Sequence, residues 1–156
     1  MNAEALPGPA RRRGDPPPDR LVIRLVPALR EAIVAPCIEA LPNEGCGLLL
    51  GRRDGTAAAI VEVLPARNDR ASPDRYEIGP EAVLGADRRA RDQGLELLGA
   101  WHSHPGGAAV PSATDRAEAW PDWCYLIVGL ADSQHPELRA WRLLGDDFVE
   151  DTLEIE

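Results

Sequence analysis

The sequence lacks lysine, long hydrophobic runs and paired cysteines. No run reaches about 18 apolar residues, so no transmembrane helix is expected. The three cysteines, at positions 37, 46 and 124, form no C-x-x-C pair, which indicates neither a disulfide framework nor a cysteine zinc site. Reduced thiols in the cytoplasm fit this pattern best. All 17 cationic residues are arginine, which we interpret as codon bias rather than avoidance of lysine-directed modification.

Acidic residues outnumber basic ones, and the formal net charge is −9. A chain of this charge repels phosphate backbones, so no nucleic-acid partner is expected, and no membrane partner either. Its 156 residues suit one domain. Residues 1–20 are rich in Pro, Arg and Gly and predict a disordered tail before a single domain over 21–156. No apolar segment follows the arginines at 11–13, so no secretory or twin-arginine signal is expected.

Hydrophobic strand patterns alternate with helical ones along the rest of the chain. Pro27 and Pro80 each suit the first turn of a helix, and a short third helix is expected near Ser112. Pro36 is expected to break or kink the first helix. The alternation predicts a mixed sheet covered by helices. The expected strands are 21–26, 47–51, 57–64, 75–78, 95–104, 123–130, 136–144 and 146–155.

Two of the three histidines stand one residue apart in the segment WHSHPGGAAVPSATD, residues 101–115. Alternate residues of a strand point to one face, so His102 and His104 are able to converge on one ion, while Ser103 faces the other way. Asp115 is the best candidate for a third ligand, because the Pro-Gly-Gly turn lets the chain leave the strand and return. Three protein ligands leave a fourth position for water, as in a catalytic zinc site.

Such a site also needs a base, and an oxyanion partner is useful. Glu44 lies at a helix-to-strand junction, where Gly45 and Gly47 permit close backbone approach, but spacing alone does not select it from 26 acidic residues. Ser112 is able to hydrogen-bond the oxyanion formed by attack on a carbonyl. Structural interpretations compete: His-x-His pairs are often structural, Glu44 suits a solvated loop, and Ser112 with Asp115 forms a typical helix cap.

The combined spacing is more specific than any of its parts. Glu44, then His102-Ser103-His104-Pro105, six residues, Ser112, two residues and Asp115 resembles the JAMM (MPN+) metalloprotease signature, and the similarity covers roughly 21–150. The resemblance implies that His102, His104 and Asp115 bind Zn²⁺. It implies that Glu44 is the general acid/base and that Ser112 stabilises the oxyanion. The implied fold is a cytidine-deaminase-like three-layer α/β sandwich, with a mixed sheet flanked by helices.

The resemblance also implies an activity and a substrate class. It implies a cytoplasmic zinc-dependent peptidase or isopeptidase that cleaves after the C-terminal Gly-Gly of a ubiquitin-like or sulfur-carrier protein, through a metal-bound water activated by Glu44. Only residues without side chains thread a narrow groove, whose expected walls are the loops 65–75 and 105–111. Two alternatives stay open: a zinc amidase or peptidase acting on cell-wall or phage-tail peptides, and a non-catalytic module that binds ubiquitin-like tails.

Overall fold

The computed structural model describes residues 20–156. The predicted tail therefore lies outside the described residues, apart from Arg20. The described chain contains seven strands and three helices. In order they are β1 (Val22–Leu25), α1 (Pro27–Ala40), β2 (Cys46–Asp54), β3 (Ala57–Ala66), α2 (Pro80–Asp92), β4 (Glu96–His104), α3 (Ala113–Glu118), β5 (Cys124–Gly129), β6 (Glu137–Leu144) and β7 (Asp147–Ile155).

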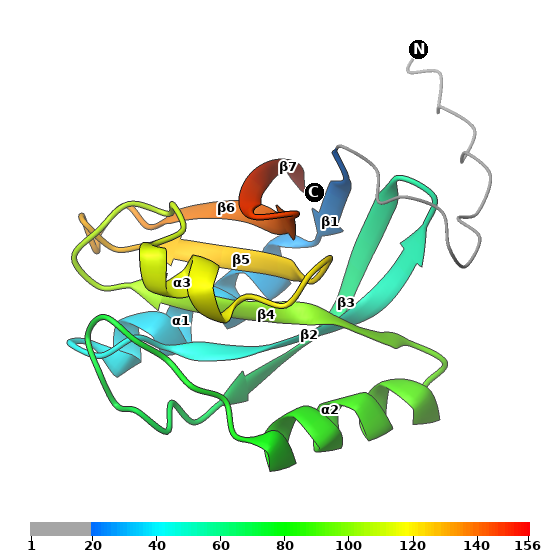
Figure 1. The fold of residues 1–156 in the computed structure, drawn as a ribbon, viewed down its shortest axis with the longest axis horizontal. Helices are drawn as coiled ribbons and strands as arrows, with labels where there is room; N and C mark the ends of the chain where they lie inside the picture. The colour runs from blue at the N-terminus through cyan, green and yellow to red at the C-terminus, as the bar shows by residue number, and fades with distance from the viewer. Residues whose placement is uncertain (1–19) are drawn as a thin grey trace.

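The strands pair in the order β1-β3-β2-β4-β5-β6-β7, and β1 also pairs with β7 (Figure 1). The pairings β1–β3, β1–β7 and β4–β5 are parallel, and the others are antiparallel. The predicted mixed sheet is therefore confirmed. The cytidine-deaminase-like sandwich is not confirmed by this pairing, because the contacts of β1 on both sides close the sheet into a barrel.

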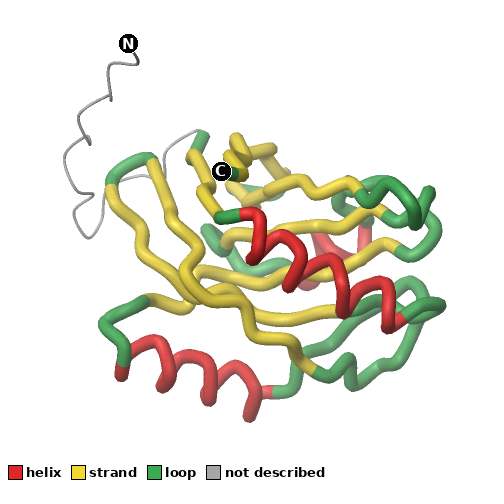
Figure 2. Tube along the Cα trace, turned by 180° about the vertical axis from the view of Figure 1, so that it is seen from behind, coloured by secondary structure: helices red, strands yellow, loops and turns green. Residues whose placement is uncertain are grey.

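Helices α1 and α2 pack against opposite faces of β2, as the alternation of its side chains requires. Leu49 packs in one buried cluster with Ile33 of α1. Its neighbours Leu48 and Leu50 pack in a second cluster with Ala86 of α2. Figures 1 and 2, which view the molecule from opposite sides, show α1 on one face of the sheet and α3 on the other. No helix within 20–156 is long and apolar enough to cross a membrane.

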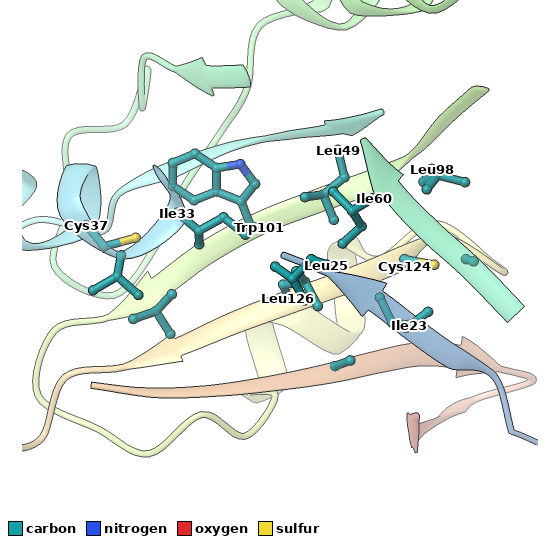
Figure 3. Close-up of a cluster of buried hydrophobic side chains, with 14 of the residues drawn as sticks. Ile23, Leu25, Ile33, Cys37, Leu49, Ile60, Leu98, Trp101, Cys124 and Leu126 are labelled. Carbon is teal, nitrogen blue, oxygen red and sulfur yellow. The ribbon is translucent and has the colours of Figure 1, made fainter. Parts of the chain in front are cut away.

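The larger cluster holds the strand that carries the two histidines. Trp101 of β4 is fully buried, and Figure 3 shows it beside Ile33 and Cys37 of α1. Leu126 of β5 and Ile23 of β1 lie in the same cluster. The packing of Trp101 against these elements thus fixes the end of β4. The residues that follow Trp101 therefore project from a rigid strand.

One local prediction is wrong, and the break that was one of the two expected effects of Pro36 does not occur. Residues 75–78 form no strand, because their backbone hydrogen bonds go to a neighbouring loop: the amide of Asp69 donates to the carbonyl of Glu77 at 2.9 Å. Helix α1 also continues through Pro36 to Ala40. Cys37, directly after the proline, is fully buried, and such packing supplies most of the stability of a short helix.

The barrel closes over a buried ion pair that the sequence did not reveal. Nε of Arg142 in β6 donates to Oδ2 of Asp151 in β7 at 2.5 Å, and Nη2 donates to Oδ1 at 2.8 Å. The same carboxylate accepts the backbone N–H of Leu21, just before β1, at 2.8 Å. One carboxylate therefore joins three consecutive strands of the barrel.

Replacing Asp151 by Asn is expected to lower the free energy of unfolding by about 3 kcal/mol, because it leaves the buried Arg142 charge without its main counter-charge. Denaturant titration followed by circular dichroism measures this change. The matched control is Asp146→Asn, at an exposed acid in the β6–β7 turn, which should change the value by no more than about 0.5 kcal/mol. Equal stability of the two variants would contradict the role assigned to the pair.

Candidate metal centre

Pairing between β2 and β4 brings Glu44 beside the histidines. Cys46 is the register partner of His102. One residue further, the backbone N–H of Ser103 donates to the carbonyl of Gly45 at 3.0 Å, and the Gly45 N–H donates to the Ser103 hydroxyl at 2.9 Å. Ser103 is fully buried and faces away from the histidines, as predicted. The two hydrogen bonds between Ser103 and Gly45 therefore hold the segment that carries Glu44 against the end of β4.

Glycine is required at two positions next to this segment. A Cβ on Gly45 would lie 2.9 Å from Cα of Cys37 in α1. A Cβ on Gly47 would lie 2.3 Å from the carbonyl oxygen of Leu64 and from the ring of Trp101. The expected close backbone approach is present at both positions. The lack of side chains lets the start of β2 lie against α1, β3 and β4 at once.

Three side chains converge on one point at the end of β4. The Nε2 atoms of His102 and His104 lie 3.2 Å apart. Oδ2 of Asp115, in the first turn of α3, lies 3.2 Å from the first nitrogen and 3.0 Å from the second. Donor atoms bound at 2.0–2.1 Å around a tetrahedral ion are about 3.3 Å from one another. The three atoms therefore have the spacing of ligands to one small metal ion.

Glu44 competes with Asp115 for the place of third ligand. The donor atoms of Glu44, His102 and His104 all lie within 4.8 Å of one another, which also permits a shared ion. Oε1 of Glu44 is 3.9 Å from Nε2 of His104, however, farther than Oδ2 of Asp115. The shorter distances favour Asp115 as the direct ligand and leave the Glu44 carboxylate next to the site.

Local hydrogen bonds aim two of the three ligands. Nδ1 of His104 lies 2.9 Å from the carbonyl oxygen of Ala108, so a proton on Nδ1 donates there and leaves the Nε2 lone pair free. Ser112 is the N-cap of α3: its hydroxyl accepts from the Asp115 N–H at 3.0 Å, and its own N–H donates to the Asp115 carboxylate at 2.9 Å. The capping interpretation is therefore correct, and the cap itself points the carboxylate at the imidazoles.

Burial and mutual charge separate the pKa values in the cluster. Burial, followed by the negative charge of Asp115, raises the pKa of Glu44 from 4.5 to about 8. Burial opposes ionisation of Asp115, but hydrogen bonds from both imidazoles outweigh it and hold the pKa of Asp115 well below its usual range. Burial lowers the pKa of His102 despite its contact with Asp115. Burial also disfavours the charged form of His104, yet its bonds to Asp115 and Ala108 prevail and raise its pKa.

The chemistry of the cluster suits a cation. It combines an ionised buried carboxylate with two imidazole nitrogens, which are the ligand atoms that zinc and similar metals prefer. Oε2 of Glu44 is buried and has no hydrogen-bond partner among the described residues. A buried carboxylate oxygen of this kind normally requires a donor, which fits a site that would hold a cation and its water.

A cavity of about 420 Å³ opens at the cluster. Glu44, His104 and Ser112 line it. Its walls come from the two loops that the sequence predicts, one supplying Pro73 and Asp74 and the other supplying residues 105–108, 110 and 111. A second cavity of about 230 Å³, between α1 and the segment 65–71, also reaches Glu44. Glu44 thus lines both cavities.

Two residues near the site were not predicted as functional. Tyr76 stacks on the His102 ring with 4.4 Å between the ring centroids and 19° between the planes. Asn68 donates to the backbone carbonyl of Glu44 at 3.1 Å. The sequence offers one signal for the asparagine, the Arg-Asn-Asp segment at 67–69 in the polar loop.

The fold and the cluster define an α/β protein with a candidate metal site that contains two histidines. A sequence model described as prokaryotic homologs of the JAB domain matches residues 26–144. The chain belongs to this family, which confirms the resemblance seen in the sequence.

Named relatives are similar over most of this chain. A desampylase of Haloferax volcanii is 36% identical over 117 residues, covering 74% of this chain and 80% of that protein. A probable TtuB-protein conjugate cleaving protease of Thermus thermophilus is 37% identical, covering 70% and 71%. A CysO-cysteine peptidase of Mycobacterium tuberculosis is 29% identical, covering 86% and 90%. Among solved structures, a Desulfitobacterium hafniense protein has a TM-score of 0.80 at 37% identity, covering 86% and 92%.

In the metal-free protein, Glu44→Gln is expected to stabilise the fold at pH 8 and to have little effect at pH 5. The folded-state pKa of Glu44, about 8, exceeds its unfolded value of 4.5, so the folded state holds this proton more tightly. Stability from this group is therefore fully present below pH 4.5 and is lost as the pH rises towards 8. Glutamine does not titrate, so the difference in melting temperature between the variant and wild type should grow across this window.

Thermal melts with chelator at both pH values measure the effect. Glu39→Gln, at an exposed position of α1, is the matched control and should show no such growth. A Glu44→Gln difference that is the same at both pH values would contradict the raised pKa.

Proposed function

We propose that this chain is a zinc-dependent peptidase that hydrolyses an amide bond after the C-terminal Gly-Gly of a ubiquitin-like or sulfur-carrier protein. The convergence of His102, His104 and Asp115 within 3.2 Å, with Glu44 alongside, is the observation that carries the proposal. Membership of the JAB family supports a hydrolase of peptide or isopeptide bonds. Relatives named desampylase, TtuB-protein conjugate cleaving protease and CysO-cysteine peptidase support the substrate class.

His102, His104 and Asp115 are the proposed zinc ligands. Two imidazole nitrogens and one carboxylate oxygen form a common zinc ligand set, and their separations suit a tetrahedral ion. When bound, zinc supplies a Lewis acid that polarises a carbonyl oxygen and lowers the pKa of a coordinated water to about 7. The charge of Asp115, which its low pKa maintains, favours a cation at this point.

Glu44 is the proposed general acid and base. Its carboxylate accepts a proton from the attacking water and returns that proton to the leaving amine. A catalytic group works best when its pKa lies near the operating pH, because it then both accepts and releases protons readily. Without a bound metal the pKa of Glu44 is about 8, and a cation beside the carboxylate would lower it towards neutrality, where Glu44 both accepts and releases protons. Glu44 also lines both cavities, which supports a place for it next to the scissile bond.

Ser112 is the proposed donor to the oxyanion. Its hydroxyl oxygen accepts the Asp115 N–H, which uses a lone pair and leaves the hydroxyl hydrogen free to donate. Ser112 also lines the larger cavity next to His104. A donor fixed by a helix cap is oriented before the substrate arrives, which is what stabilisation of developing charge requires.

The larger cavity supports a glycine tail as substrate. Its walls are formed by Pro73, Asp74 and the loop 105–111, so both predicted loops border the path to His104. Glycine residues occupy little width and expose their backbone amides, which suits a channel between two loops. The tail is proposed to lie in this cavity, with the leaving amine directed towards the cavity between α1 and residues 65–71.

We also propose a fold type, a domain organisation and a cellular location for the protein. Helices α1 and α2 on opposite faces of the sheet support a closed variant of the three-layer, cytidine-deaminase-like arrangement within one domain, 21–156. All three cysteines, which lie among the described residues, are buried free thiols, and this supports action in the reducing cytoplasm.

Glu44→Gln is expected to lower kcat by about 10²–10⁴-fold, because glutamine cannot transfer the proton, while zinc stays bound. The assay incubates the enzyme with a sulfur-carrier protein bearing a C-terminal extension after Gly-Gly and follows cleavage by intact mass. Elemental analysis measures the zinc content of each variant. Glu39→Gln is the control and should cleave like wild type. Normal turnover by Glu44→Gln would refute the assigned role, and cleavage that survives chelation would refute the metallopeptidase class.

Ser112→Ala is expected to lower kcat by about 10²–10³-fold through loss of the oxyanion donor. The same change removes the cap of α3, which should lower the free energy of unfolding by only about 1 kcal/mol. Ser112→Thr keeps a hydroxyl that both caps and donates, so it should retain most of the activity. Both kcat values are measured at saturating substrate. If the alanine and threonine variants have equal kcat values, Ser112 acts only as a helix cap.

A further inference from the structure

We propose that Tyr76, held in place by Asn68, is a positioning residue that fixes the ring of His102 for metal binding. The inference rests on the proposed metal site and assigns a role to a loop that contributes no ligand. Metal-binding histidines are normally oriented by a hydrogen bond from the ring nitrogen that faces away from the metal. The two histidines of this site differ in this respect.

His104 has the usual arrangement, because its Nδ1 lies 2.9 Å from the carbonyl oxygen of Ala108. His102 does not: its Nδ1 is buried and has no hydrogen-bond partner among the described residues. The face of the His102 ring lies instead against Tyr76, with centroids 4.4 Å apart and planes 19° from parallel. A ring stacked in this way cannot turn about its Cβ–Cγ bond without striking the tyrosine. The stack thus sets the direction of Nε2.

Asn68 holds the backbone on both sides of Tyr76. Its Nδ2 donates to the carbonyl oxygen of Arg75 at 2.9 Å, and its Oδ1 accepts the N–H of Glu77 at 3.0 Å. The side chain of Asn68 thereby takes the place of a neighbouring strand for the residues that flank Tyr76. This explains why the segment is extended yet belongs to no sheet, and why the tyrosine side chain has one fixed direction.

The same loop also holds the proposed base. Nδ2 of Asn68 donates a second hydrogen bond, to the carbonyl oxygen of Glu44 at 3.1 Å. The N–H of Glu44 donates to the carbonyl oxygen of Ser72 at 2.8 Å. Both backbone groups of Glu44 are therefore bonded to the loop that carries Tyr76. One loop sets the position of the base and, through a ring contact, the direction of a ligand.

The test compares zinc affinity in Tyr76→Leu and Tyr76→Phe, using competition with a chromophoric chelator. Leucine fills much of the volume but offers no flat ring, and we expect affinity to fall by about 10–100-fold, as when a partner that orients a ligand is lost. Phenylalanine keeps the stack and should retain wild-type affinity. Phe148→Leu is the matched control, since Phe148 packs on Tyr125 and contacts no ligand. It should bind zinc like wild type.

The absorption spectrum of the cobalt-substituted protein supplies a second measurement. It would not change if Tyr76 only filled space. Cobalt(II) reports the geometry of its ligands, so the spectrum should shift in Tyr76→Leu and not in Phe148→Leu. If Tyr76→Leu has wild-type zinc affinity and an unchanged spectrum, the positioning role of Tyr76 is overturned, while the proposed function is not. A wild-type chain that binds no zinc would remove the proposed function as well.

Asn68→Asp tests the other half of the proposal and keeps Tyr76 in place. A carboxylate cannot donate to the carbonyls of Arg75 and Glu44, so the loop should loosen and zinc affinity should fall. If Asn68 acts through the ring, the two changes are not additive, and Asn68→Asp should have little further effect on affinity in the Tyr76→Leu background. Full additivity, or wild-type affinity in Asn68→Asp, would overturn the link. If Tyr76→Leu does not fold, Asn68→Asp alone still tests the proposal, because wild-type zinc affinity in this variant would overturn it.

Discussion

The structure around the site depends on one arrangement: an ionised carboxylate, Asp115, placed within 3.2 Å of two imidazole nitrogens in a buried position. Bringing these groups together removes them from water, and a buried charge is costly unless it is paired. The fold brings them from two elements, the end of β4 and the first turn of α3. A cation at this point would compensate the negative charge that the fold itself maintains, so the proposed metal binding and the local structure would support each other.

Sequence patterns predicted the parts of this arrangement that depend on local geometry. The alternation of a strand placed His102 and His104 on one face, and a glycine-rich turn followed by a capped helix brought Asp115 back to them. Most strand and helix positions followed from hydrophobic periodicity for the same reason. Closure of the barrel did not, because it depends on β1 pairing with both β3 and β7, contacts between residues far apart in the chain. The Arg142–Asp151 pair belongs to the same class.

The loop between β3 and α2 shows why an extended pattern is not always a strand. Residues 75–78 have the alternation of a strand, yet their hydrogen-bond partners are a side-chain amide and a single backbone N–H. An asparagine side chain carries the same donor and acceptor groups as a peptide unit, so it can substitute for a neighbouring strand. No periodicity reports such a substitution. Only the folded structure shows that Asn68 faces both Glu44 and the residues around Tyr76.

The neighbouring carboxylates of Asp115 and Glu44 have different pKa values, as two different roles require. Asp115 accepts hydrogen bonds from two imidazoles and from the helix start, which favours its charged form. Glu44 has no such donors at Oε2 and feels the charge of Asp115, which favours its protonated form. Such divergence marks one group as a permanent charge and the other as a group that exchanges protons. The same contacts support the proposed roles of Asp115 as a metal ligand and of Glu44 as the group that transfers protons.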